Sequence, residues 1–184
     1  MLIRVESTPN PETLKFLPDC LIMGDKPGLD LTPDQASCSP LARKIFGISD
    51  EITRVFLGAN FVSVTTITEA SWDFLRPLVI HTITDHLLSG GQVESAQTSV
   101  AMDLDWEDPL IRDIHQLIDE RIRPAVAQDG GDIQLRGFSQ GVVYVKLMGA
   151  CVGCPSAQMT LKMGVENMLK HYVPQVQRVE ALQE

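Results

Sequence analysis

The chain has 184 residues, 44% of them hydrophobic and 21% charged, which is the composition of a globular protein with one large or two small domains. Its formal net charge is −9, and an acidic surface repels phosphate backbones, so we expect no nucleic-acid partner. No apolar run approaches the ~18 residues that span a bilayer, and no basic amphipathic stretch predicts membrane attachment.

The amino-terminal residues 1–6 are typical of a β-strand and carry neither a secretion signal nor an organelle presequence. We therefore expect a cytoplasmic protein, or the mature form of an organelle protein. Four cysteines are too few for a disulfide scaffold. In a reducing compartment, paired thiols are more often metal-binding or redox-active.

The first half of the chain alternates short strands with two helices. Turn residues and apolar spacing predict the following elements in chain order: strands near 3–5 and 14–17, a loop over 24–38, a helix from Ser39-Pro40 to about Gly47, strands at 55–57 and 61–64, and a helix from Ser71 to Gly90. Pro77 lies inside the last pattern, so we expect a kink there or a later helix start.

The second half begins after a stretch that is poor in large apolar side chains. Asp108-Pro109 is a strong helix-start pair. The elements predicted from there are a helix with Ile111, Ile114, Ile118, Ile122 and Val126 on one face, a hairpin of 133–138 with 142–147, a helix from Pro155 to Tyr172 and a short strand over 176–179. The predicted fold class is α+β, with two small α+β domains at 1–90 and 108–184 and a flexible linker over 91–107.

Cys151 and Cys154 stand two residues apart between a predicted strand and a predicted helix. Pro155 suits the first helical position, which places Cys154 at or beside the cap, where free amides and the helix dipole favour thiolate over thiol. Gly153 permits a positive φ, so that amides can turn inward. This local geometry favours an exposed, activated pair.

Three interpretations of the pair stay open: ligation of a metal or cluster, thiol–disulfide exchange, and ordinary cysteines. The interpretation as a thiol–disulfide exchange site is less favoured, because proline follows the pair and because a hairpin, not a βαβ unit, precedes it. A zinc site needs two more ligands. His171 is 17 residues from Cys154 along a helix, about 25 Å away, and His115 has no partner of its own, so surface histidines are the better interpretation of both.

If the pair ligates a cluster, the number of thiolates predicts how many chains that cluster needs. One chain supplies two, whereas a [4Fe–4S] cluster takes four, so two copies facing across a twofold axis would complete the shell. A cluster bridged in this way should be easy to release, which suits a carrier.

Other polar and sulfur-containing side chains are better explained by structure. Cys20 and Cys38 lie on no motif, and Asp129 and Asp132 flank two glycines that read as a helix stop rather than as a cation site. We expect no metal at His81 and His86, which are five residues apart, and we expect packing roles for Trp72 and Trp106. Met159, Met163 and Met168 are expected in the core or at a dimer face.

Motifs in both halves of the chain resemble a known family. GACVGCPS at 149–156, preceded by DGGD at 129–132, resembles the C-terminal domain of the NifU-like iron–sulfur scaffold family. The first half is similar to the companion Nfu-type N-terminal domain in three stretches: 8–16, 39–42 and 55–65.

The resemblance implies a protein that is not an enzyme. It implies a [4Fe–4S] cluster that bridges two protomers through Cys151 and Cys154 and is then delivered to apo-proteins, with upstream assembly proteins as further partners. A second serine is common in the family where this chain has Ala157, and Met148 and Met159 are less usual. The cysteine-rich and ferredoxin-like domains of longer NifU proteins have no counterpart here, which favours a carrier. The runner-up is a cytoplasmic thiol–disulfide oxidoreductase, and the first domain is expected to recognise partners.

Overall fold

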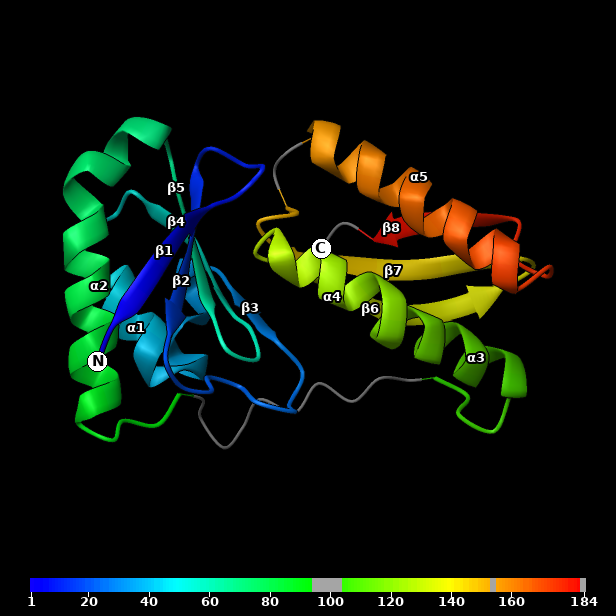
Figure 1. Cartoon of the computed structure of the whole chain (residues 1–184), viewed down its shortest axis with the longest axis horizontal. Helices are drawn as coiled ribbons and strands as arrows, with labels where there is room; N and C mark the ends of the chain where they lie inside the picture. Colours follow the sequence, from blue (N-terminus) through cyan, green and yellow to red (C-terminus); the bar gives the residue numbers. More distant parts are fainter. Residues whose placement is uncertain (94–103, 153–154, 183–184) are drawn as a thin grey trace. The chain divides into compact units, whose positions relative to one another are not determined.

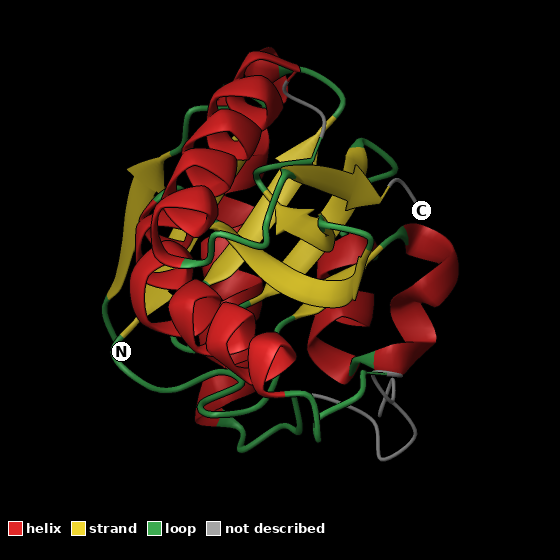
Figure 2. Ribbon diagram, turned by 90° about the vertical axis from the view of Figure 1, so that its right-hand side faces the viewer, coloured by secondary structure: helices red, strands yellow, loops and turns green. Residues whose placement is uncertain are grey.

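The computed structural model describes residues 1–93, 104–152 and 155–182. The chain divides into two compact units, Met1–Ser99 and Val100–Glu184, and each combines helices with strands. Figure 2 colours the helices red and the strands yellow. The predicted α+β class is therefore confirmed. Residues 94–103 of the predicted linker lie outside the described residues. The domain boundaries at 90 and 108 stay a prediction.

Unit 1 is built on an antiparallel sheet of five strands in the order β1-β2-β5-β4-β3 (Figure 1). The strands are β1 (Ile3–Ser7), β2 (Thr13–Pro18), β3 (Leu29–Leu31), β4 (Ile52–Leu57) and β5 (Val62–Thr66). Apolar side chains of β2, β4 and β5 alternate along their strands and point into one core, as the period of a half-buried strand requires.

Two helices close this core, α1 (Pro40–Phe46) and α2 (Trp72–Leu88), with short 3-10 turns η1 (Pro33–Cys38) and η2 (Glu69–Ser71). The predicted start of α1 is confirmed, because the Ala42 N–H donates to the Ser39 hydroxyl at 3.1 Å. Trp72 is buried in the core and its indole N–H donates to the Glu12 carbonyl at 3.1 Å, so its predicted packing role is confirmed.

One expectation for unit 1 was wrong in detail. The stretch 24–38 is not all loop, because it holds β3 and η1. β3 has only three residues and exists through its pairing with β4, which local sequence does not reveal. α2 begins at Trp72 and contains Pro77, so the alternative of a later helix start is excluded, whereas the expected kink stays a prediction. Pro77 is the sixth residue of α2, where its missing N–H removes one hydrogen bond of the helix.

Unit 2 contains one continuous helical segment, a hairpin, a second long helix and a final strand. In chain order these are α3 (Pro109–Leu117), η3 (Ile118–Ile122), α4 (Arg123–Gln128), β6 (Gly131–Ser139), β7 (Val142–Gly149), α5 (Pro155–Tyr172) and β8 (Arg178–Leu182). The predicted hairpin is confirmed, and α5 does begin at Pro155. The last strand pairs in parallel with β7.

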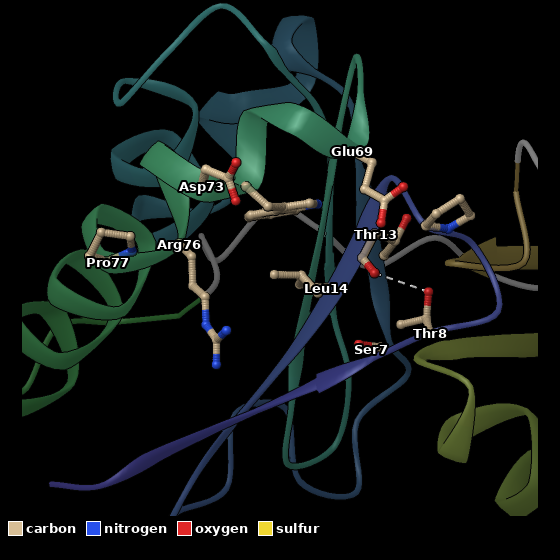
Figure 3. A pocket seen from close by; sticks show the side chains of 10 residues that line it. Ser7, Thr8, Thr13, Leu14, Glu69, Asp73, Arg76 and Pro77 are labelled. Atoms are coloured by element: carbon tan, nitrogen blue, oxygen red, sulfur yellow. Dashed lines mark hydrogen bonds between the residues drawn. The ribbon is translucent and has the colours of Figure 1, made fainter.

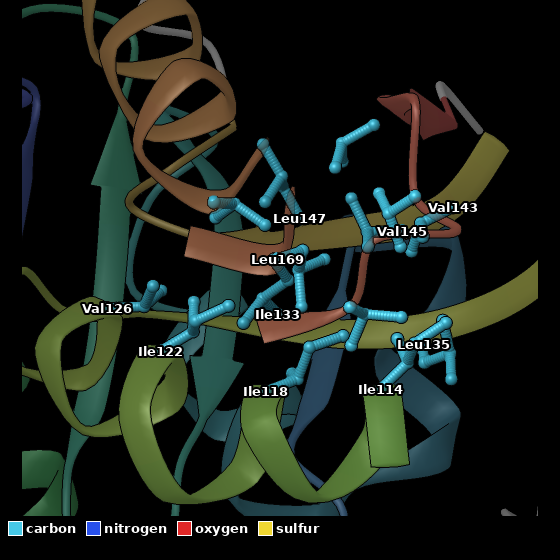
Figure 4. Packing of buried hydrophobic residues seen from close by; sticks show 14 of the residues in the cluster. Ile114, Ile118, Ile122, Val126, Ile133, Leu135, Val143, Val145, Leu147 and Leu169 are labelled. Atoms are coloured by element: carbon cyan, nitrogen blue, oxygen red, sulfur yellow. The ribbon is translucent and has the colours of Figure 1, made fainter. Parts of the chain in front are cut away.

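The core of unit 2 lies between the helices and one face of the three-stranded sheet (Figure 4). All five apolar positions predicted on the first helix are buried: Ile111, Ile114, Ile118, Ile122 and Val126. The single helix expected there is interrupted by the π-helical turn η3, in which the Arg123 N–H donates to the Ile118 carbonyl. Pro124 follows immediately and has no N–H to continue the α-helical ladder.

None of the helices in the described parts of the chain is long and apolar enough to cross a membrane.

Candidate functional site

The cysteine loop begins at the open end of the β6–β7 hairpin, far from the turn that joins the two strands. Gly131, the first residue of β6, lies opposite Gly149, the last residue of β7. One residue further on, the Ala150 N–H donates to the Gly130 carbonyl at 3.2 Å, and the Val152 N–H donates to the Gly149 carbonyl at 3.0 Å. Gly149 has a φ of +65°, which glycine adopts without strain. The chain therefore leaves the sheet through a tight turn that carries Cys151.

Cys151 is only 6% exposed and belongs to the core cluster of unit 2. The expectation of an exposed pair was therefore wrong for this cysteine. Its sulfur occupies the space into which a side chain at position 131 would project. Cys154 and Gly153 lie outside the described residues, so the expectations for them stay predictions.

The start of β6 is fixed by an ion pair that the sequence did not reveal. Asp132 is buried, and its two oxygens accept hydrogen bonds from Nε and Nη2 of Arg123 at 2.8 and 2.9 Å. Asp119 accepts a further bond from the same guanidinium at 3.1 Å. The hydrogen bond to Asp132 is the main cause of a raised pKa for Arg123, which therefore stays charged. No period or spacing in the sequence signalled this pair, because Arg123 opens α4 six residues before the DGGD motif.

The pairing with Arg123 also bears on whether the Asp132 carboxylate could bind a cation. A carboxylate that already binds a guanidinium with both oxygens is poorly placed to ligate a cation, which agrees with its interpretation as part of a helix stop. Asp129 is exposed beside it. Among the residues that the structure describes, no group of three His, Cys, Asp or Glu side chains could hold a metal ion.

The histidines are placed as ordinary structural residues. His115 lies 3.3 Å from Asp119 and packs edge-on against Trp106, and His171 is exposed. His81 is exposed as well, whereas His86 is 2% exposed and its Nε2 lies 2.9 Å from the Gln92 carbonyl.

The remaining sulfur-containing residues fall into two groups. Cys20 and Cys38 are half-buried in unit 1, away from any motif. Met168 packs on the core of unit 2, as expected. Met159 and Met163 are 67% and 59% exposed, so they are not core residues, and their place at a dimer face stays a prediction.

Unit 1 has a pocket of about 490 Å³ between the β1–β2 turn and the start of α2 (Figure 3). Thr8 and Trp72 form part of its wall, and the charged side chains around it are Glu69, Asp73 and Arg76. All three charged residues are exposed and they carry both signs, so the pocket has no clear preference for an anion or a cation.

Comparison with known proteins places both units. Residues 114–180 match the family described as "NifU-like domain", and residues 3–90 match the family described as "Scaffold protein Nfu/NifU N terminal". The two matches define the class, a scaffold protein with an N-terminal Nfu domain and a NifU-like domain. The chain belongs to this Nfu/NifU-like scaffold family.

Several relatives are similar over almost the whole chain. "NFU1 iron-sulfur cluster scaffold homolog, mitochondrial" of Homo sapiens is 40% identical over 182 residues, which cover 98% of this chain and 71% of that protein. The proteins of the same name from Drosophila persimilis and Drosophila virilis are each 39% identical over 183 residues, and the chain spans 64% and 61% of their lengths. The solution structure of a NifU-like protein from Saccharomyces cerevisiae aligns with 53% of this chain and 87% of its own, at 22% identity and a TM-score of 0.48.

Proposed function

We propose that this protein is an iron–sulfur cluster carrier that holds a [4Fe–4S] cluster between two copies of the chain and delivers it to apo-proteins. The observation that carries the proposal is the placement of Cys151. It sits on a tight turn between β7 and α5, in the domain that matches the NifU-like family. The printed names of the relatives, which call them iron–sulfur cluster scaffold homologues, support the same cargo.

Cys151 and Cys154 are the proposed ligands, and their number requires a second copy. The other two cysteines of the chain, Cys20 and Cys38, belong to unit 1. Thiolates are the ligands that iron–sulfur clusters take, and four are needed for a cubane. Two copies, each contributing one pair, complete the set and leave the cluster at the contact between them.

The protein would then act by binding and transfer rather than by catalysing a reaction. The cluster is its cargo, received from upstream assembly proteins and passed to apo-acceptors. Unit 1 is proposed to recognise these partners. We propose a cytoplasmic location, or the matrix of an organelle for a mature form, and the word "mitochondrial" in the relatives' names favours the second.

The test is anaerobic incubation of the full chain with iron and sulfide, followed by measurement of the iron content, the mass in solution and the transfer of the cluster to an apo-acceptor. We expect a brown protein of doubled mass with four irons per two chains. Cys151→Ala and Cys154→Ala should each abolish loading, and a matched variant with Cys20 and Cys38 both changed to alanine should load normally.

Two outcomes would contradict the proposal: a monomer that holds the whole cluster, or a protein that takes up no iron. A colourless protein that catalytically reduces a disulfide would identify the oxidoreductase instead, and a fixed content of zinc would identify a structural metal module.

A further inference from the structure

We propose that Gly131 is a positioning residue for the cluster ligand Cys151, because the space left by its missing side chain is the seat of the Cys151 sulfur. The consequence for the cluster rests on the proposed function, whereas the seat itself is a property of the metal-free chain and can be tested without iron.

The first support is the distance between the two residues. A β-carbon built on Gly131 would lie under 3.0 Å from Sγ of Cys151 and 2.7 Å from the Met148 carbonyl oxygen. Real β-carbons essentially never approach other heavy atoms so closely. Any residue other than glycine must therefore displace the sulfur, the backbone of β7 or both.

The second support is that the backbone on both sides of this contact is held in place. The pairing of Gly131 with Gly149 and the bond from the Ala150 N–H to the Gly130 carbonyl fix the turn on which Cys151 is carried. On the opposite side, the bidentate pair of Asp132 with Arg123 holds the start of β6 against the helix. A methyl group at position 131 would therefore meet the sulfur between two backbone segments, the cysteine turn and the start of β6, that are each held by hydrogen bonds.

The contrast with Gly164 shows that this closeness is local. Gly164 lies on α5 in the same unit, and a β-carbon there would meet nothing within 4 Å. Gly164→Ala is therefore a matched control, and it should be neutral or slightly stabilising because alanine favours a helix.

The test is a double-mutant cycle on the metal-free full chain, with Gly131→Ala made in the native background and in Cys151→Ala. Removal of the sulfur leaves the close contact with the Met148 carbonyl and a milder one, at 3.4 Å, with the β-carbon of residue 151. The Tm loss caused by Gly131→Ala should therefore be smaller by about 4 °C or more in the Cys151→Ala background. Gly164→Ala should shift Tm equally in both backgrounds. If Gly131→Ala lowered Tm equally in the two backgrounds, the proposal that the Cys151 sulfur occupies the space beside Gly131 would be wrong.

Gly131→Ala could fail to fold in both backgrounds because of the Met148 carbonyl. The unaltered chain then provides the decisive measurement, the rate at which iodoacetamide alkylates Cys151, located by peptide fragmentation. A seated sulfur should react at least tenfold more slowly than in the urea-unfolded chain. Similar rates in the two states would overturn the proposal.

The effect on the ligand is read from the loaded protein. Gly131→Ala should retain less than half of the iron held by the native chain and by Gly164→Ala, with an altered charge-transfer absorption. Equal iron with an unchanged spectrum would refute the positioning role. A native chain that takes up no iron would instead refute the proposed function, while the result of the metal-free cycle would stand.

Discussion

Removal of the Asp132 carboxylate should lower the Tm of unit 2 strongly. Asp132 is buried and accepts three hydrogen bonds, two from Arg123 and one from the Ile133 N–H at 2.8 Å. Breaking a fully buried ion pair costs about 3–5 kcal/mol. The Arg123 side chain is 35% exposed and keeps Asp119, so water and that carboxylate offset part of the loss. We expect about 2–3 kcal/mol for Asp132→Ala, which corresponds to roughly 10–20 °C in Tm for a domain of this size.

The two tryptophans make this measurement specific to one unit. Trp72 lies in unit 1 and Trp106 in unit 2, so a Trp72→Phe background reports the thermal unfolding of unit 2 by fluorescence. Asp129→Ala is the matched control, because it removes the same charge from the same motif at an exposed position and should change stability by less than about 0.5 kcal/mol. If Asp132→Ala lowered Tm no more than Asp129→Ala does, the ion pair would not hold β6 in place.

Three further predictions use the same fluorescence readout for the unit concerned. Acid should weaken unit 2 through Glu166, since the Lys170 ammonium lowers the pKa of its carboxyl below the ordinary 4.5. Its contribution is complete above pH 4.5 and is lost as the pH falls through the folded value, so urea titrations of the native chain and Glu166→Gln should converge only at the acid end. His86→Ala should destabilise unit 1 by roughly 2 kcal/mol because a buried, hydrogen-bonded ring is lost, whereas equal, small effects of His86→Ala and the exposed His81→Ala would refute this. Ile118→Ala should cost unit 2 about 3 kcal/mol, because it leaves a cavity in the core, and a loss under about 1 kcal/mol would show that the core collapses to fill it.

The secondary structure of unit 2 shows which features the local sequence can predict. The face of the first helix was predictable because apolar residues recur at the helical period from Ile111 to Val126, and all of the predicted positions are buried. The hairpin was predictable from its alternation and from the turn at Gln140-Gly141, where both residues have a positive φ. These signals lie within a few residues of one another, so one short window contains them.

Contacts between distant segments were not predictable in this way. The three-residue strand β3 depends on β4, and the parallel pairing of β8 with β7 depends on how α5 packs. The bond between Arg123 and Asp132 was equally hidden, since no period or spacing relates a guanidinium on a helix to a carboxylate on the following strand.

The sequence by itself determined the two-domain α+β class, the helix faces and the identity of the cysteines as candidate ligands, because composition and short-range periodicity carry that information. The tertiary structure decided that Cys151 is buried rather than exposed, and that its sulfur occupies the space beside Gly131. The physical reason is that close packing is a property of two surfaces brought together, and a glycine 20 positions earlier in the chain has no local sign that it faces a thiol.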